Sequence, residues 1–356
     1  MKRDKLSIHD IARLANVSAA TVSRVINNSD KVKAETRDKV QAIIDENNFK
    51  PNELARGLYT KRSKAIGVIM PEISNHFFAK MFMQIEKAAM THGQSVFLCN
   101  TLSDNSLEDY FVAYLSDKQV DGLILLGGRC NESKPNKNYI EFLKKEVLDM
   151  PIVTINGRFE RYKGMYASVS SDEYSTTCKG VERLLGMGHS KIGFLGGVVG
   201  VTSTDIKIKA LQKMKSAGGF AAKPSWVVHG GYDYASGAFC MESLLAQKDL
   251  PTAIIAVNDE VAAGAINYCV RRGLHVPESF SILGFDDSAI ATTTLPAITT
   301  FAHRYEEIGN TAVEFLYRMI CGDDPSSIES ESSWHVVLGM DFIERSSCKR
   351  FCTTSV

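Results

Sequence analysis

The chain has 356 residues, of which 44% are hydrophobic and 23% charged, and its formal net charge is zero. This composition excludes a disordered chain, and the length favours two or three domains over one. The charge is uneven, because residues 1–63 carry 13 Lys and Arg against 8 Asp and Glu, and the remainder carries 28 against 33. A basic N-terminal segment on an acidic body is expected if only that segment contacts nucleic acid.

Secretion, membrane insertion and metal binding are disfavoured by the sequence. The N-terminus lacks the apolar core of a signal peptide, and no apolar run is long enough to span a membrane. The eight cysteines are scattered without metal-ligand spacing, which is typical of reduced thiols in a cytoplasmic protein. Cys348 and Cys352 fall in a short C-terminal tail that we expect to be mobile and open to oxidation. We therefore expect no cofactor and no metal.

Residues 7–28 predict two short helices joined by a tight turn. Ser7 and Ser18 are suitable N-cap residues, and Asn16 suits a turn that needs a positive φ. The residues expected to face inward are Ile8, Ile11, Ala12 and Leu14 in the first helix and Val22, Val25 and Ile26 in the second. Helix, turn and capped helix form the DNA-binding helix-turn-helix, whose second helix enters the major groove.

An ordinary pair of core helices would show the same apolar pattern. Residues 21–24, TVSR, favour the DNA-binding interpretation, since they place hydroxyls and a cation on the exposed face of the second helix. By position, the residues expected to contact bases are Ala19, Ala20 and Arg24, and those expected to contact phosphates are Thr21, Ser23 and Asn27. Base-specific hydrogen bonding then depends mainly on Arg24, because alanine offers only a methyl group.

A third helix and a short linker helix are predicted next. The third helix covers about residues 34–47, with Val40, Ile43 and Ile44 packed inward, but Lys33 at its N-cap position supplies no capping oxygen. Asn52 can cap a helix that ends near Leu58. So short a helix, weakened by Gly57, is marginal in water, and we expect it to fold only when docked.

The rest of the chain alternates short apolar runs with helical segments. The predicted strands begin at Ala65, Ser95, Gly122, Pro151, Lys191, Ala253 and Ser281, and the helices between them include residues 77–91, 175–187 and 260–272. Buried strands alternating with helices indicate an α/β fold with parallel sheets covered on both faces. There are too many strands for one compact sheet, so we predict two doubly wound lobes with a cleft between them.

The chain resembles the lactose-repressor (LacI/GalR) family of bacterial transcription regulators. The resemblance rests on the helix-turn-helix, on residues 35–58, and on PEISNHFF at Pro71, VDGLIL at Val120, GH at Gly188, PTAIIAVND at Pro251, VPESFSILGFDD at Val276 and ITT at Ile298. It implies a homodimer that reads a pseudopalindromic operator in double-stranded DNA. It also implies a hinge helix in the minor groove, with Leu58 as the wedge between base steps and Ala55 beside it. The body would resemble periplasmic sugar-binding proteins, with three crossings between lobes.

These features divide the chain into four parts. Residues 1–50 are the predicted headpiece, 51–63 the hinge helix and linker, 64–347 the two-lobed effector-binding and dimerisation body, and 348–356 the tail. No leucine heptad follows the body, so we expect a dimer, formed through lobe helices such as residues 77–91.

The effector site is expected where polar residues follow the apolar strands. The candidates are Asn75, Phe77, Arg129, Asn156, Arg158, Tyr232, Asn258 and Asp286. The family often has an arginine that contacts effector where this chain has Ile206, so that contact passes to Lys207, Arg129 or Arg158, or is absent. Asp259 is as consistent with a helix cap as with a ligand contact.

The leading hypothesis is a repressor whose operator affinity depends on a small molecule in the cleft. A sugar is our first choice of effector, and a nucleoside or purine is the second. A cytoplasmic sugar-binding protein would need the same body but not the basic headpiece. We expect no catalysis, because the sequence contains no nucleophile elbow, phosphate-binding loop or paired-carboxylate site, and the adjacent Asp286 and Asp287 are expected to point different ways.

Overall fold

The computed structural model describes residues 6–26, 29–47, 49, 62–134, 136–147, 149–159, 165–325 and 334–351. It divides the chain into two compact units, Met1–Lys64 and Ala65–Val356. The predicted hinge residues Ala55 and Leu58, and Asn27, lie outside the described residues. No helix in the described part is long and apolar enough to cross a membrane.

The headpiece, which is the described part of residues 6–49, contains three helices: α1 (Ile8–Ala15), α2 (Ala19–Ile26) and α3 (Ala34–Glu46). Ser7 caps α1 in a capping box with Asp10, and Asn16 ends that helix in the left-handed region with φ 54°. Thr21 N donates to Ser18 Oγ at 3.2 Å, as a cap of α2 requires. Lys33 makes no capping hydrogen bond, as predicted.

The core of the headpiece differs from the prediction at one position. Leu14 is 53% exposed, and Ala15 is fully buried in its place. Ala15 follows Ile11 by four residues and shares its buried face of α1, whereas Leu14 lies about 100° away from Ala15 around the helix. Val22, Val25 and Val40 are buried as predicted, and Ile43 packs at the edge of the same cluster.

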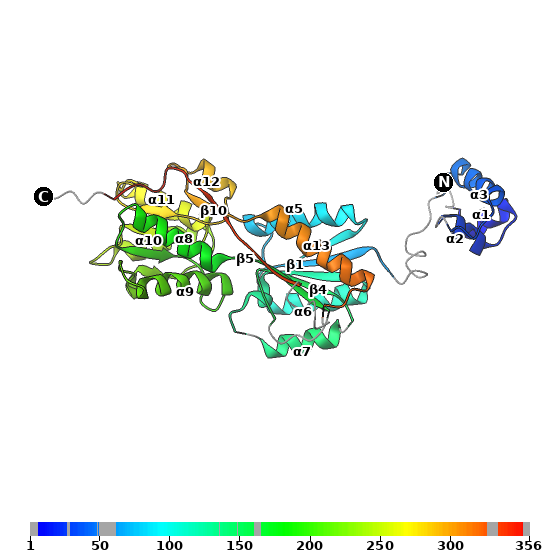
Figure 1. Cartoon of the computed structure of the whole chain (residues 1–356), viewed down its shortest axis with the longest axis horizontal. Coiled ribbons are helices and arrows are strands. Elements are labelled where there is room, and N and C mark those ends of the chain that lie inside the picture. Colours follow the sequence, from blue (N-terminus) through cyan, green and yellow to red (C-terminus); the bar gives the residue numbers. More distant parts are fainter. Residues whose placement is uncertain are drawn as a thin grey trace. The chain divides into compact units, whose positions relative to one another are not determined.

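Lobe 1 comprises residues 65–171 and 305–338, and its six strands are all parallel in the order β11-β5-β4-β3-β1-β2. The strands are β1 (Ala65–Met70), β2 (Ser95–Asn100), β3 (Gly122–Leu126), β4 (Ile152–Ile155), β5 (Tyr166–Ser171) and β11 (His335–Leu338). The helices are α5 (His76–Thr91), α6 (Asn105–Asp117), α7 (Lys137–Glu146) and α13 (Tyr305–Cys321), with the 3-10 turn η1 (Gly128–Asn131). One face of the sheet packs on α5 and α13 and the other on α6 and α7 (Figure 1).

Lobe 2 comprises residues 173–302 and 341–351, and its main sheet has four parallel strands in the order β7-β6-β8-β9. They are β6 (Ile192–Leu195), β7 (Val227–Val228), β8 (Ala253–Ala256) and β9 (Ser281–Leu283), and β10 (Thr300–Ala302) pairs antiparallel with β12 (Asp341–Ile343). The helices are α8 (Glu173–Gly186), α9 (Thr202–Ser216), α10 (Tyr234–Leu245), α11 (Asp259–Arg271) and α12 (Ala289–Thr293), with the 3-10 turn η2 (Pro224–Trp226).

The chain passes between the lobes three times: from β5 to α8, from β10 to α13, and from β11 to β12. The prediction of two doubly wound parallel-sheet lobes behind a helix-turn-helix is therefore confirmed. These three connections place the carboxyl ends of strands from both sheets around one space.

The start of the predicted C-terminal tail is part of lobe 2. Phe351 N donates to Met187 O at 2.8 Å, and Lys349 N donates to Ser281 Oγ at 3.1 Å. Residues 349 and 351 are therefore held against lobe 2. Burial raises the pKa of the Cys348 thiol to about 12. Oxidation of Cys348 stays a prediction, and Cys352 lies outside the described residues.

Candidate functional site

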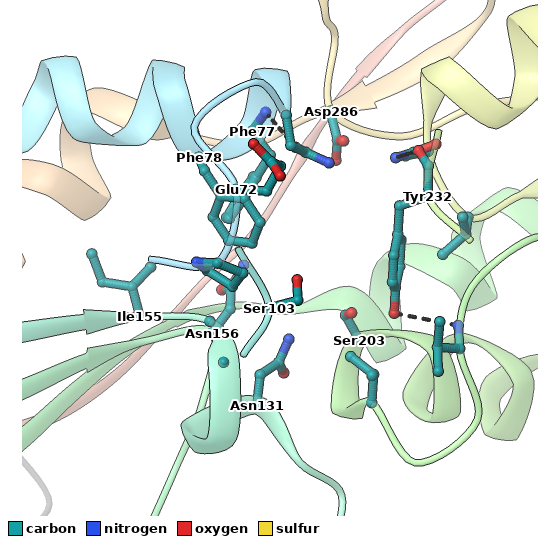
Figure 2. A pocket seen from close by; sticks show the side chains of 18 of the residues that line it. Glu72, Phe77, Phe78, Ser103, Asn131, Ile155, Asn156, Ser203, Tyr232 and Asp286 are labelled. Atoms are coloured by element: carbon teal, nitrogen blue, oxygen red, sulfur yellow. Dashed lines mark hydrogen bonds between the residues drawn. The ribbon is translucent and has the colours of Figure 1, made fainter. Parts of the chain in front are cut away.

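A cavity of about 740 Å³ lies between the two lobes, beyond the carboxyl ends of their strands (Figure 2). In open α/β sheets this edge is where ligands bind. Seven of the eight predicted effector residues line it: Asn75, Phe77, Arg129, Asn156, Tyr232, Asn258 and Asp286. Figure 2 shows Phe77 and Phe78 on the lobe 1 side and Tyr232 and Ser203 on the lobe 2 side, with open space between them.

On the lobe 1 side, polar residues hold the cavity wall in place as well as facing it. Asn75 is the N-cap of α5, and its Oδ1 accepts from Phe77 N at 3.0 Å. Asn156 follows β4 in the left-handed region with φ 55°, and its Oδ1 accepts from Ser171 N at 2.8 Å. The amide oxygens of both residues are therefore already engaged by the backbone.

On the lobe 2 side, Tyr232 presents its ring to the cavity and its hydroxyl to α9. The hydroxyl lies 2.7 Å from Thr204 Oγ1. Asn258 holds this segment, since its Nδ2 donates to Tyr232 O at 2.8 Å while its Oδ1 accepts from Val261 N at 2.9 Å as the cap of α11. Because both ends of the buried Asn258 amide are engaged, this residue fixes the position of Tyr232.

Asp286 joins lobe 2 to the crossing between β10 and α13. Its Oδ1 lies 3.1 Å from His303 Nε2, and His303 Nδ1 lies 2.6 Å from Ser171 Oγ at the end of β5. A φ of 99° at Asp286 is rare outside glycine and turns the carboxylate toward the cavity. The adjacent Asp287 instead forms an ion pair with Arg345 and is absent from the lining, as the sequence predicted for one of the two.

A buried ion pair that the sequence did not predict forms part of the lobe 2 wall. Lys207 Nζ on α9 lies 2.6 Å from Glu173 Oε1 at the start of α8, and both side chains are buried. Ile206, at the position of the family's arginine, is absent from the lining, and Lys209 is exposed. Lys207, next to Ile206, lines the cavity, but its ammonium group is engaged by Glu173.

Arg129 is held in the same way on the lobe 1 side. It lies in the turn η1, with Nε 3.5 Å from Glu108 Oε2, and it also pairs with Asp109. Its guanidinium stacks 3.7 Å from the centre of the Tyr139 ring. A Cβ on Gly128 would lie 2.6 Å from Glu108 Oε2, so this glycine is needed for the close approach of the carboxylate.

Arg158 is the one predicted effector residue that the structure does not bring to the cavity. It is exposed and absent from the lining, because the chain leaves the cavity edge after Asn156. Gly157 packs against the backbone of Cys130, and a Cβ there would lie 2.2 Å from Cys130 O.

Asp259 is not the cap of α11, since Asn258 takes that role. It is fully buried behind Asp286, where its carboxylate accepts from Thr300 Oγ1 at 2.6 Å and from Ser288 N at 2.8 Å. Burial, followed by the negative charge of Asp286, raises the pKa of this carboxyl to about 8. No group of three or more His, Cys, Asp or Glu side chains arranged to hold a metal occurs among the described residues.

The candidate DNA-contacting residues lie on α2 of the headpiece. Arg24 and Ala20, one turn apart, are exposed, whereas Ala19 is half-buried and packs against the headpiece core. Thr21 Oγ1 lies 2.9 Å from Ser18 Oγ at the start of the helix. An exposed cation on the outer face of the second helix is the arrangement that major-groove reading requires.

Comparison with known proteins identifies both parts of the chain. Residues 7–52 match the family described as "Bacterial regulatory proteins, lacI family", and residues 181–348 match "Periplasmic binding protein-like domain". Over 312 residues, 87% of this chain and 91% of the relative, it is 33% identical to catabolite control protein A of Priestia megaterium. The chain belongs to the LacI family.

Other relatives of this LacI-family protein are also regulators. The "HTH-type transcriptional repressor PurR" of Haemophilus influenzae (strain PittEE) is 31% identical over 89% of this chain and 92% of its own length. A crystal structure of the lac repressor dimer bound to operator and the anti-inducer ONPF superposes with a TM-score of 0.83 at 25% identity, covering 97% of this chain and all of that one. The LacI-family protein is thus a DNA-binding transcription regulator with a ligand-binding body.

Proposed function

We propose that this LacI-family protein is a homodimeric, cytoplasmic repressor that binds a pseudopalindromic operator and changes its affinity when a sugar enters the cavity. The observation that carries the proposal is that residues of both lobes line one cavity. A ligand that contacts both lobes stabilises the lobe orientation in which those contacts form. Residues 51–63, of which 51–61 lie outside the described residues, would pass this change to the headpieces. No catalytic step is part of the proposal.

The proposed dimer face is on lobe 1. Met83 and Met90 on α5 are 63% and 71% exposed, and Phe97 and Leu98 on the edge strand β2 are 43% and 41% exposed. Large apolar side chains gathered on a helix and the adjoining edge strand support a protein–protein interface. The test is sedimentation velocity of the full chain, in which Met83→Glu together with Phe97→Asp is expected to convert dimer into monomer. A parent chain that sediments as a monomer at micromolar concentration would contradict the proposal.

The regulatory proposal is tested in two steps with the full chain. Operator sequences are first selected from random duplex DNA, and affinity is then measured by fluorescence anisotropy. A thermal-shift screen with sugars and nucleosides identifies ligands of the cavity, because a ligand that favours the native state raises its melting temperature. We expect a stabilising sugar to change operator affinity at least about fivefold, the lower end of typical allosteric coupling. A nucleoside that alone does so would replace the sugar.

A further inference from the structure

The side chains that line the cavity carry a large excess of negative charge. Seven of them are acidic, whereas only two, Arg129 and Lys207, are lysine or arginine. The acidic residues are Glu72, Glu108, Glu132, Glu173, Asp233, Glu260 and Asp286. A cavity of this kind concentrates field lines of one sign and attracts ligands of the opposite sign.

Both cations are already neutralised by buried partners. Lys207 Nζ lies 2.6 Å from Glu173 Oε1, and these side chains are 3% and 8% exposed. Arg129 lies between Glu108 and Asp109, and its side chain is 8% exposed. An anionic ligand could use either cation only by breaking a buried pair, which leaves a carboxylate uncompensated.

Five carboxylates remain in the lining without a lysine or arginine partner in the described part of the chain: Glu72, Glu132, Asp233, Glu260 and Asp286. Their partners that the structure describes are neutral groups or a histidine. Glu72 accepts from Ser74 Oγ at 3.0 Å, Asp233 accepts from Ser236 N at 2.7 Å, and Asp286 contacts His303. Burial, followed by the negative charges of Asp233 and Asp286, raises the pKa of the Glu260 carboxyl.

The cavity is also lined by neutral polar side chains that carry hydroxyl or amide groups. They include Ser103, Asn131 and Ser203. Hydroxyl and amide groups both donate and accept hydrogen bonds, so these side chains suit the hydroxyls of a ligand. Figure 2 shows Asn131 below the space bordered by Ser103 and Ser203, and Tyr232 adds an aromatic surface suited to a cation or a sugar ring.

We propose that the effector is a hydroxyl-rich compound that carries an ammonium group, of which an amino sugar is the simplest kind, and that phosphorylated sugars are rejected. The inference rests on the proposed function only in taking the cavity as the effector site. The carboxylates without a lysine or arginine partner bind the ammonium group, and the serine and asparagine side chains of the lining bind hydroxyls.

The test uses sets of hexoses in which the sugar is the same and only its charge differs. One set is glucosamine, glucose and glucose 6-phosphate, and the others are the galactose and mannose counterparts. Thermal shift and calorimetry of the full chain are expected to show binding of at least one amino sugar, weaker binding of its neutral counterpart, and none of its 6-phosphate. Tighter binding of a neutral or phosphorylated member, or no binding of any amino sugar, overturns the proposal.

Variants separate local contacts from overall charge. Glu72→Gln is expected to weaken amino-sugar binding about tenfold, as loss of one charge-assisted hydrogen bond should, and to leave binding of the neutral hexose unchanged. Glu141→Gln removes an exposed carboxylate on α7, outside the cavity lining, and is the matched control. Equal effects of the two substitutions would overturn the proposal.

Operator binding measured in the same samples distinguishes the two proposals. If an amino sugar binds but leaves operator affinity unchanged, the ligand class stands and the proposed regulation fails. If a neutral sugar binds more tightly and changes operator affinity, the regulation stands and the ligand class fails.

Discussion

Lys207 and Glu173 form a buried ion pair that ties α9 to the start of α8 beside the effector cavity. Nζ and Oε1 are 2.6 Å apart, and Lys207 Nζ also lies 4.8 Å from the centre of the Phe285 ring. In this environment neither charge is solvated well on its own. The pair therefore fixes the lobe 2 wall of the cavity, at the cost of leaving each member dependent on the other.

Removing one member of this pair is expected to destabilise the body strongly. Lys207→Met leaves Glu173 buried without its cation, and the free energy of unfolding should fall by about 3–5 kcal/mol. Replacing both residues by Met and Leu should recover most of this loss, because no unpaired charge remains. Urea denaturation followed by circular dichroism measures each value.

The matched control is the exposed pair of Lys144 and Glu141, which lie 2.8 Å apart on α7. Lys144→Met is expected to change the free energy of unfolding by no more than about 1 kcal/mol, since exposed pairs contribute little. If the loss of unfolding free energy in the double variant equalled the sum of the losses in Lys207→Met and Glu173→Leu, the two residues would not be coupled.

Asp259 is expected to make the stability of the body depend on pH. Its pKa of about 8 in the folded chain exceeds the ordinary value near 4, so between these values the folded state holds a proton that the unfolded state releases. The contribution of this proton to the free energy of unfolding is fully present below about pH 4. It is lost as the pH rises toward 8, at up to about 1.4 kcal/mol per pH unit.

Asp259→Asn removes this titration and retains groups that can bond Thr300 and Ser288. The measurement is the free energy of unfolding from pH 5 to pH 8.5 for both proteins. We expect the variant to gain stability relative to the parent as pH rises. If the free energies of unfolding of the two proteins changed in parallel with pH across this range, Asp259 would be ionised in the folded protein.

The strands that could be predicted are the uniformly apolar ones, and β5 shows why others could not. Residues 166–171 read YASVSS, which has no apolar run, yet the strand is largely buried between β4 and β11. Its serine hydroxyls find partners far along the chain: Ser168 Oγ lies 2.9 Å from His335 Nδ1, and Ser171 Oγ lies 2.6 Å from His303 Nδ1. Local sequence carries no sign of partners so distant.

The same limit applies to the candidate site. The seven predicted effector residues that line the cavity, such as Asn75 and Asp286, could be predicted because the ends of parallel strands meet at one edge of a sheet. Glu173 and Lys207 could not be paired from the sequence, since their contact depends on how α8 and α9 pack. Arg158 satisfied the same positional rule, but the chain turns away before it reaches the cavity.

Arg24 is expected to supply most of the base-specific hydrogen bonding to the operator. It is exposed on α2, where Ala20 can add only a methyl contact. Arg24→Ala should weaken operator binding by about 10- to 100-fold, the value of one bidentate contact to guanine, and leave the melting temperature of the body unchanged. Fluorescence anisotropy with the selected operator and an unrelated duplex measures the loss of preference.

Arg13→Ala is the control for general charge, since Arg13 is 79% exposed on α1 and pairs with Asp10. It should weaken binding to both duplexes by similar factors, and by less than Arg24→Ala weakens binding to the operator. If the two substitutions reduced operator binding equally, Arg24 would act as a phosphate contact and the reading of bases would lie elsewhere.

Tyr232 is expected to act on the effector through its ring. Tyr232→Phe keeps the ring and loses the contacts of the hydroxyl with Thr204 Oγ1 at 2.7 Å and with Val198 N at 3.5 Å, whereas Tyr232→Ala removes the surface against which a sugar ring can pack. With glucosamine as the probe, calorimetry should show nearly parental affinity for the Phe variant and a loss of about 10-fold or more for the Ala variant, which corresponds to about 1.4 kcal/mol or more. Equal losses in both would mean that the hydroxyl, through Thr204 and α9, shapes the cavity and that the ring does not contact the ligand.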